Sequence, residues 1–141
     1  MPPNDDLLVA VEKELMPLVA RLPLRIVEHR EGTSFDLASV TLEGGNVQVQ
    51  LQRERGPIHT GFSPVTARFK RFDSFVLMEY LGLSKNHGLT GTDLNVVLRG
   101  LAAFLIRCWK DLDSAFAHDR APQTIEQLHA IQLAQDKARW D

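Results

Sequence analysis

The segment between residues 34 and 55 constrains the fold more than any other part of the chain. Two runs of alternating apolar and polar residues flank the glycine pair Gly44-Gly45. Glycine tolerates the positive φ angles of a two-residue primed turn, and such a pair between alternating runs is typical of a β-hairpin. With these glycines as the loop, facing residues have numbers that sum to 89, which pairs Val40 with Val49.

In this register the apolar side chains of both runs share one face of the hairpin. They are Ala38, Val40, Leu42, Val47, Val49 and Leu51. The opposite face carries a polar row, made of Ser39, Thr41, Gln48, Gln50 and Gln52. One face of an antiparallel sheet often stays in water, so this row is either a wet surface or the contact surface for a partner. The register also places Arg53 opposite Asp36 on the apolar face, which predicts an ion pair at the end of the strip.

Periodicities on either side of the hairpin complete the predicted fold. Two further strands are expected over residues 24–32 and 58–62, and helices over residues 5–22, 74–81, 92–115 and 122–140. Pro17 removes a backbone donor inside the first helix, where we expect a kink or a break. Consecutive strands with short turns form an antiparallel meander. We therefore predict a single α+β domain over residues 1–141, a three- to four-stranded meander packed on one face by N-terminal and C-terminal helices.

Composition and charge narrow the function classes. The 141 residues are 44% hydrophobic and 24% charged, which is typical of an ordinary globular chain. The formal charge of -2 argues against a polycation that binds nucleic acid through its whole surface. No apolar run is long enough for a membrane span, and the start of the chain is acidic where a signal peptide would be basic. We expect a cytoplasmic protein with no membrane partner.

Residues able to carry catalysis or hold a metal show no recognisable pattern. Cys108 lies inside the apolar stripe of the helix over residues 92–115, which predicts a buried and unreactive thiol. No two of the five histidines have the spacing of three or four residues that would place them together on a helix. Nucleotide-binding and phosphate-loop motifs are absent from the sequence as well. The sequence thus predicts no catalytic residue, no metal site and no cofactor.

Positive charge is concentrated between Leu51 and Arg71. Five basic residues there face one acidic residue, Glu54, which gives this segment a net charge of +4. The basic residues are Arg53, Arg55, Arg68, Lys70 and Arg71. Arginine suits bidentate contacts with carboxylate or phosphate, so the segment is either a site for an anion or acidic partner or a solvated edge with ordinary ion pairs. The absence of a nucleic-acid-binding motif argues against nucleic acid.

About a third of the chain resembles a known pattern. The runs SFDLASVTLE from Ser34, VQVQLQRERG from Val47 and FDSFVLMEYLG from Phe72 resemble short bacterial proteins of unknown function, some of which are similar to the immunity proteins of toxin systems. The resemblance implies a small non-enzymatic protein that binds another protein, and it transfers no functional residue.

The leading hypothesis is a non-catalytic protein that binds a macromolecular partner, in the manner of an immunity protein or antitoxin. Its contact surface is expected to combine the basic segment with the polar residues Gln48, Gln50 and Gln52, and its partner is expected to be an acidic protein. The alternative is a protein that binds a small molecule or anion, or an enzyme without a recognised motif, at the arginine-rich end of the sheet. Self-association stays open.

Overall fold

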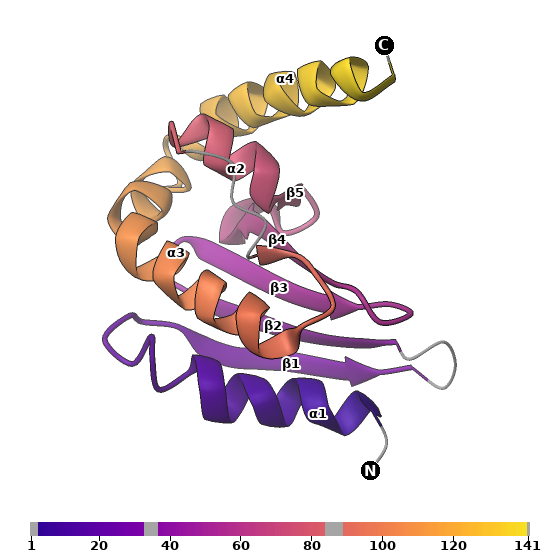
Figure 1. The fold of residues 1–141 in the computed structure, drawn as a ribbon. Helices are drawn as coiled ribbons and strands as arrows, with labels where there is room; N and C mark the ends of the chain where they lie inside the picture. Colours follow the sequence, from indigo (N-terminus) through magenta and orange to yellow (C-terminus); the bar gives the residue numbers. More distant parts are fainter. Residues whose placement is uncertain (1–2, 33–36, 84–88, 141) are drawn as a thin grey trace.

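The computed structural model describes residues 3–32, 37–83 and 89–140 (Figure 1). Its centre is an open five-stranded antiparallel sheet in which neighbouring strands follow one another along the chain. The strands are β1 (Arg25–Glu31), β2 (Ala38–Gly44), β3 (Val47–Arg53), β4 (Ile58–Pro64) and β5 (Phe72–Asp73). The predicted α+β class with an antiparallel meander is confirmed. β5 was not predicted, because two residues are too few to show an alternating pattern.

The N-terminal helix ends just before Pro17, as the sequence predicts. Helix α1 (Pro3–Ala10) continues into the π-helical turn η1 (Val11–Leu15), and irregular turns then lead to Arg21. Proline has no backbone N–H and clashes with the preceding helical turn, so a regular helix cannot run through it. Within α1 and η1, Leu7, Val11 and Leu15 are fully buried.

Helix α3 (Leu94–Ala115) is the main core helix. Its N-cap is Asp93, whose Oδ1 accepts a hydrogen bond of 3.2 Å from the backbone N–H of Val96; the helix therefore starts slightly later than the sequence indicates. Its buried apolar residues include Leu98, Leu101, Leu105, Cys108 and Leu112. Burial raises the pKa of the Cys108 thiol, which supports the predicted low reactivity.

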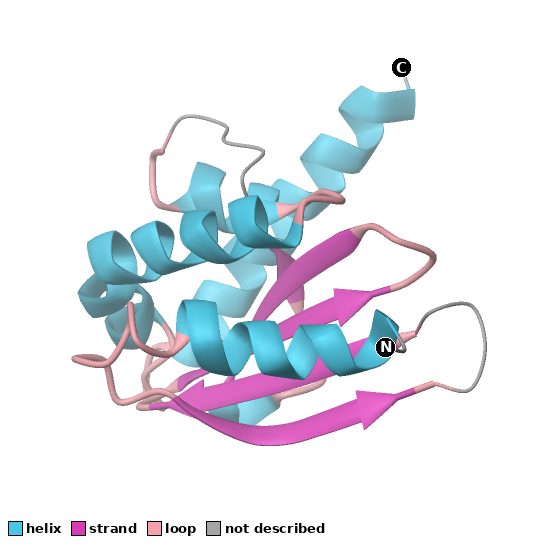
Figure 2. Ribbon diagram, turned by 60° about the horizontal axis from the view of Figure 1, so that its bottom comes forward, coloured by secondary structure: helices cyan, strands magenta, loops and turns pink. Residues whose placement is uncertain are grey.

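Helices α1 and α3 lie on the same side of the sheet (Figures 1 and 2) and cover its apolar face. On that face Val40, Leu42, Val49 and Phe62 are at most 1% exposed. Phe62 of β4 also contacts the Phe104 ring of α3, with ring centroids 5.4 Å apart. The predicted burial of the valine and leucine face is therefore confirmed.

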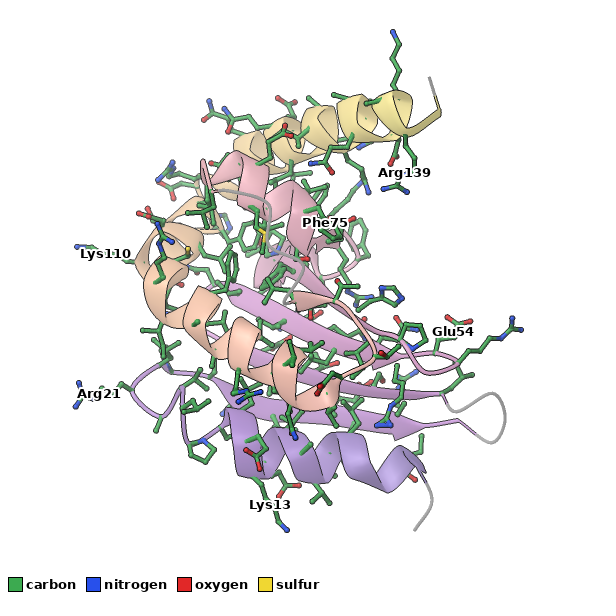
Figure 3. The ribbon with its side chains drawn as sticks, viewed as in Figure 1. Lys13, Arg21, Glu54, Phe75, Lys110 and Arg139 are labelled. Atoms are coloured by element: carbon green, nitrogen blue, oxygen red, sulfur yellow. The ribbon has the colours of Figure 1, made fainter. Side chains whose placement is uncertain are left out.

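The two remaining helices pack at the β4–β5 side of the sheet. Helix α2 (Ser74–Tyr80) is capped as predicted by Asp73, whose Oδ1 accepts from the N–H of Val76 at 3.0 Å. Helix α4 (Ala121–Trp140) packs on α2, and Gln135 Nε2 donates to the carbonyl of Phe75 at 3.3 Å. Figure 3 shows Phe75 beneath α4. Leu133, expected in the apolar stripe of α4, is 56% exposed because α4 touches α2 rather than the covered sheet face.

The β2–β3 hairpin has the predicted faces but a different register. Facing residues have numbers that sum to 91, so Val40 lies opposite Leu51, and the predicted pair of Val40 with Val49 is wrong. The loop is Gly45-Asn46 rather than Gly44-Gly45, and Gly45 takes the positive φ, 54°. A shift of two residues keeps every side chain on its own face, so the alternating pattern cannot detect it.

The register also corrects the predicted environment of Arg53. Ala38 lies opposite Arg53 on β2, so the prediction that Asp36 occupies that position is wrong. Asp36 itself lies outside the described residues, and the predicted ion pair with it stays a prediction. Arg53 does lie on the apolar face, as its parity with Leu51 indicates.

Candidate functional site

The polar face of the sheet is organised in three rows that run across the strands. Register places the side chains of facing residues next to one another, so each row is read directly from the strand pairing. The first row is Arg25, Glu43, Gln48 and Ser63; the second is Glu28, Thr41, Gln50, Gly61 and Asp73; the third is Arg30, Ser39, Gln52 and His59. The polar face is thus a continuous surface built from β1, β2, β3 and β4, with β5 at its side.

Side chains of the first row are hydrogen-bonded to one another and to Arg68. Ser63 Oγ donates to Gln48 Oε1 at 3.4 Å, and Gln48 Nε2 donates to Glu43 Oε2 at 2.6 Å. Arg68, in the segment between β4 and β5, donates from Nε to Glu43 Oε2 at 2.7 Å and from Nη2 to Glu43 Oε1 at 3.2 Å. Gln48 and Arg68, both predicted to bind a partner, are therefore engaged by the protein itself.

The ion pair between Arg68 and Glu43 makes stability depend on pH. The hydrogen bond from Arg68 is the main cause that holds the pKa of Glu43 below its ordinary value of 4.5. Because the folded-state pKa is lowered, the pair stabilises the fold above pH 4.5, and this contribution is lost as the pH falls through the lowered pKa. We expect Glu43→Gln to be less stable than the wild type at pH 7 and equally stable at the acid end. Urea unfolding at a series of pH values measures this convergence.

Glu54→Gln provides the control for loss of one negative charge. Glu54 lies in the β3–β4 turn, away from Arg68, and Figure 3 shows it at the edge of the molecule. A stability difference between Glu43→Gln and the wild type that stays constant from pH 7 to the acid end would contradict the assignment of this pair.

The second and third rows border a hollow of about 260 Å³. Thr60 lines it too, but its hydroxyl donates to the carbonyl of Leu89 at 2.9 Å, and the other polar lining residues are Gln50, Gln52, His59, Arg71, Asp73 and Gln132. Asp73 already caps α2, but the side chains of Gln50, Gln52, His59, Arg71 and Gln132 make no hydrogen bond or ion pair within the described part of the chain. They come from β3, β4, the β4–β5 connection and α4, so folding brings together residues from four segments. We refer to Gln50, Gln52, His59, Arg71 and Gln132 as the open polar surface.

Arg71 lies flat on the sheet because residue 61 is a glycine. A Cβ at position 61 would lie 2.5 Å from Cδ and 2.7 Å from Cγ of Arg71. Without that Cβ, the arginine stem rests over the second row while its residue stays exposed to solvent. Arg71 thereby lines the same hollow as Gln50 and Gln52.

The predicted basic segment does not form one patch. Arg53 is buried on the apolar face, and Arg55 lies in the β3–β4 turn with a φ of 57°. Arg68 is at the other end of the sheet, since its partner Glu43 faces Gln48, five residues and about 16 Å along β3 from Arg53. Lys70 is exposed, with Nζ 5.8 Å from the centroid of the Phe69 ring.

Sequence reasoning found part of the open polar surface. It identified Gln50, Gln52 and Arg71 as candidates, and the structure brings these three together. It did not select His59, although the alternation of β4 places that residue on the polar face. No local pattern could identify Gln132, because it reaches the hollow only through the packing of α4 on α2.

Comparisons with known proteins provide no relative for this chain. No family model matches it, and neither a curated protein nor a solved structure matches it. Among residues 3–32, 37–83 and 89–140, no three histidine, cysteine, aspartate or glutamate side chains gather as a metal site. Within the same ranges, no helix is long and apolar enough to span a bilayer.

Proposed function

We propose that this chain is a non-catalytic protein that binds a protein partner through the open polar surface. The observation that carries the proposal is the contrast between the rows. From Glu43 to Ser63 the first row is hydrogen-bonded internally, whereas Gln50, Gln52 and Arg71 in and beside the other rows have no partner within the described residues. Since α1 and α3 cover only the opposite face, these groups are available to another molecule.

The shape and chemistry of this surface favour a protein over an enclosed small molecule. Sites that enclose a drug-sized ligand usually have about 300 to 1,000 Å³, and this hollow has about 260 Å³. Amides and an imidazole can both donate and accept hydrogen bonds, whereas Arg71 only donates and prefers a carboxylate. The partner is therefore expected to place an aspartate or glutamate against Arg71. Inhibition of a target in the manner of an immunity protein or antitoxin is one form of such binding.

Charge reversal at Arg71 tests the proposal. Wild type and Arg71→Glu, each used as bait in a lysate of the source organism, should differ in capture of the specific partner. With the purified partner, Arg71→Glu should slow association by about tenfold at low salt, with a smaller effect at high salt because the attraction is screened. Stopped-flow or surface-based association rates measure this effect.

Two further variants separate a local contact from a general charge effect. Arg99→Glu makes the same charge change at an exposed position on α3 and should leave the association rate within about twofold. Gly61→Ala keeps all charges but displaces the Arg71 stem, and it should weaken partner binding. Equal slowing by Arg71→Glu and Arg99→Glu would contradict the assignment of the surface. Turnover of a substrate, or saturable binding of a small metabolite in the hollow, would contradict the proposed protein-binding function.

A further inference from the structure

Strand β1 forms a long open edge of the sheet. The strand order leaves one side of β1 without a neighbouring strand in the described parts of the chain, and six of its seven residues are exposed. Figure 2 shows α1 over the sheet, inward of β1. The opposite edge is different, because β5 has only two residues and Ile58 of β4 exchanges backbone hydrogen bonds with Gly91. An open edge with unused backbone groups is a ready site for pairing with another strand.

The pairing with β2 determines which backbone groups of β1 point to the open edge. The N–H of Gly32 donates to the carbonyl of Leu37 at 2.8 Å, which continues the β1–β2 register. In an antiparallel pair, residues bonded to the neighbouring strand alternate with residues whose N–H and C=O point the other way. Counting back from Gly32, Arg30 is bonded to β2, whereas His29 and Glu31 direct their N–H and C=O groups to the open edge. No described residue bonds to these groups there.

The charges of β1 on the polar face have opposite signs. Glu28 and Arg30 both lie on that face and form an ion pair of 2.6 Å, while their side chains stay 50% and 77% exposed. A row of like charges would repel a second copy of the strand and so protect the edge. Opposite charges two residues apart instead allow two antiparallel copies to set each glutamate against an arginine.

One position of a two-fold axis satisfies both the backbone and the charges. The regular part of β1 is residues 28–31, beyond a bulge between Ile26 and Glu28. An axis at Glu28, Arg30 or Glu31 would set a charged residue directly against its own copy, which is destabilising. An axis at His29 lets the outward N–H and C=O of the two His29 residues bond to each other. Glu28 of each copy then faces Arg30 of the other, at positions where paired strands approach most closely.

We propose that β1 is a self-association site, at which two copies of this chain pair antiparallel about a two-fold axis at His29. The pairing joins the two sheets into one continuous sheet, with Glu28 of each copy against Arg30 of the other. A symmetric contact of this kind closes on itself and stops at a dimer. Because the paired segment is short, the dimer is weak and depends on concentration. The contact does not include Arg71 or the hollow, so it goes beyond the proposed partner binding.

Sedimentation analysis of two charge variants tests the dimer. The mass of the wild type should rise from 15.9 kDa toward twice that value between about 10 μM and 1 mM, a range that covers a weak interface. Glu28→Lys places like charges opposite one another across the axis, and so does Arg30→Glu. Each variant alone should therefore dimerise at least about tenfold more weakly. An equimolar mixture of the two should recover the dimer, because every pair across the axis then joins opposite charges.

Glu12→Lys and Arg99→Glu provide the matched control. Both residues are exposed, on η1 and α3 rather than on β1, and the two substitutions make the same charge changes. Alone or mixed, these variants should keep the dimer Kd within about twofold of the wild type. The control separates pairing at β1 from a general attraction between oppositely charged variants.

Amide hydrogen exchange of the wild type gives a readout that needs no variant. The His29 amide should exchange more slowly as the concentration rises, whereas the Arg30 amide, which already donates to β2, should change much less. A wild type that is monomeric at about 1 mM would overturn the proposal. It would also fail if the mixture of Glu28→Lys and Arg30→Glu dimerised no better than either variant alone, or if His29 exchange did not depend on concentration. Arg71→Glu should leave dimerisation unchanged, which separates this result from the partner-binding test.

Discussion

Replacing Leu105 by alanine is expected to lower the free energy of unfolding by about 2 to 5 kcal/mol, the range for a buried leucine in a well-packed core. Leu105 is fully buried on the face of α3 that packs against the rest of the core. Alanine removes apolar contact area and leaves a cavity that the rigid sheet can fill only in part. Leu101, one turn earlier and equally buried, should behave in the same way. Urea unfolding monitored by circular dichroism measures the loss.

The next residue along the helix provides a matched control. Ile106 is 58% exposed, so Ile106→Ala should change the free energy of unfolding by no more than about 0.5 kcal/mol. Similar losses for the two variants would show that α3 does not pack on the core through the face containing Leu105.

Gly44→Ala is expected to cost about 3 kcal/mol of stability, near the upper end of the usual range for overpacking. The new Cβ would overlap the carbonyl oxygen of Pro23 and come within 2.6 Å of its carbonyl carbon. Both are backbone atoms of the segment that enters β1, so relief requires moving a strand rather than rotating a side chain. Thermal or urea unfolding of the purified variant measures this cost.

Gly82→Ala distinguishes this clash from the ordinary effect of losing a glycine. Gly82 follows α2 with a φ of 73°, and nothing lies within 4 Å of where its Cβ would be. Only backbone strain opposes that substitution, at a cost of about 1 kcal/mol. If Gly44→Ala destabilises no more than Gly82→Ala, the close approach of Pro23 to Gly44 is not present in solution.

The β2–β3 hairpin shows which structural features the alternation of apolar and polar residues can predict. Alternation alone predicted that Val40, Leu42 and Val49 would be buried and that Gln50 and Gln52 would lie on the other face, and the structure agrees. These outcomes follow from the two-residue period of a strand, which needs no knowledge of distant residues.

The register of the β2–β3 hairpin depended on contacts with distant residues, which the local sequence pattern does not reveal. Asp113 of α3 accepts a hydrogen bond from the N–H of Asn46 at 2.8 Å, and the Asn46 Nδ2 donates to the carbonyl of Asp113 at 3.2 Å. These bonds hold the turn at Gly45-Asn46, while Gly44 is needed for the approach of Pro23. The glycine pair that suggested one turn therefore serves two separate purposes.

The candidate site residues likewise include some whose placement was predictable from the sequence and others whose placement only the tertiary structure shows. Residue types and strand parity sufficed to place Gln50 and Gln52 on the polar face and Arg53 on the apolar face, because a side chain's face depends only on its position along the strand. Only the tertiary structure decided that Arg68 pairs with Glu43, that Arg71 lies over Gly61, and that α4 brings Gln132 to the hollow. Each of these depends on two segments distant in sequence, and their approach is determined by how helices and strands pack together rather than by the residues within either segment.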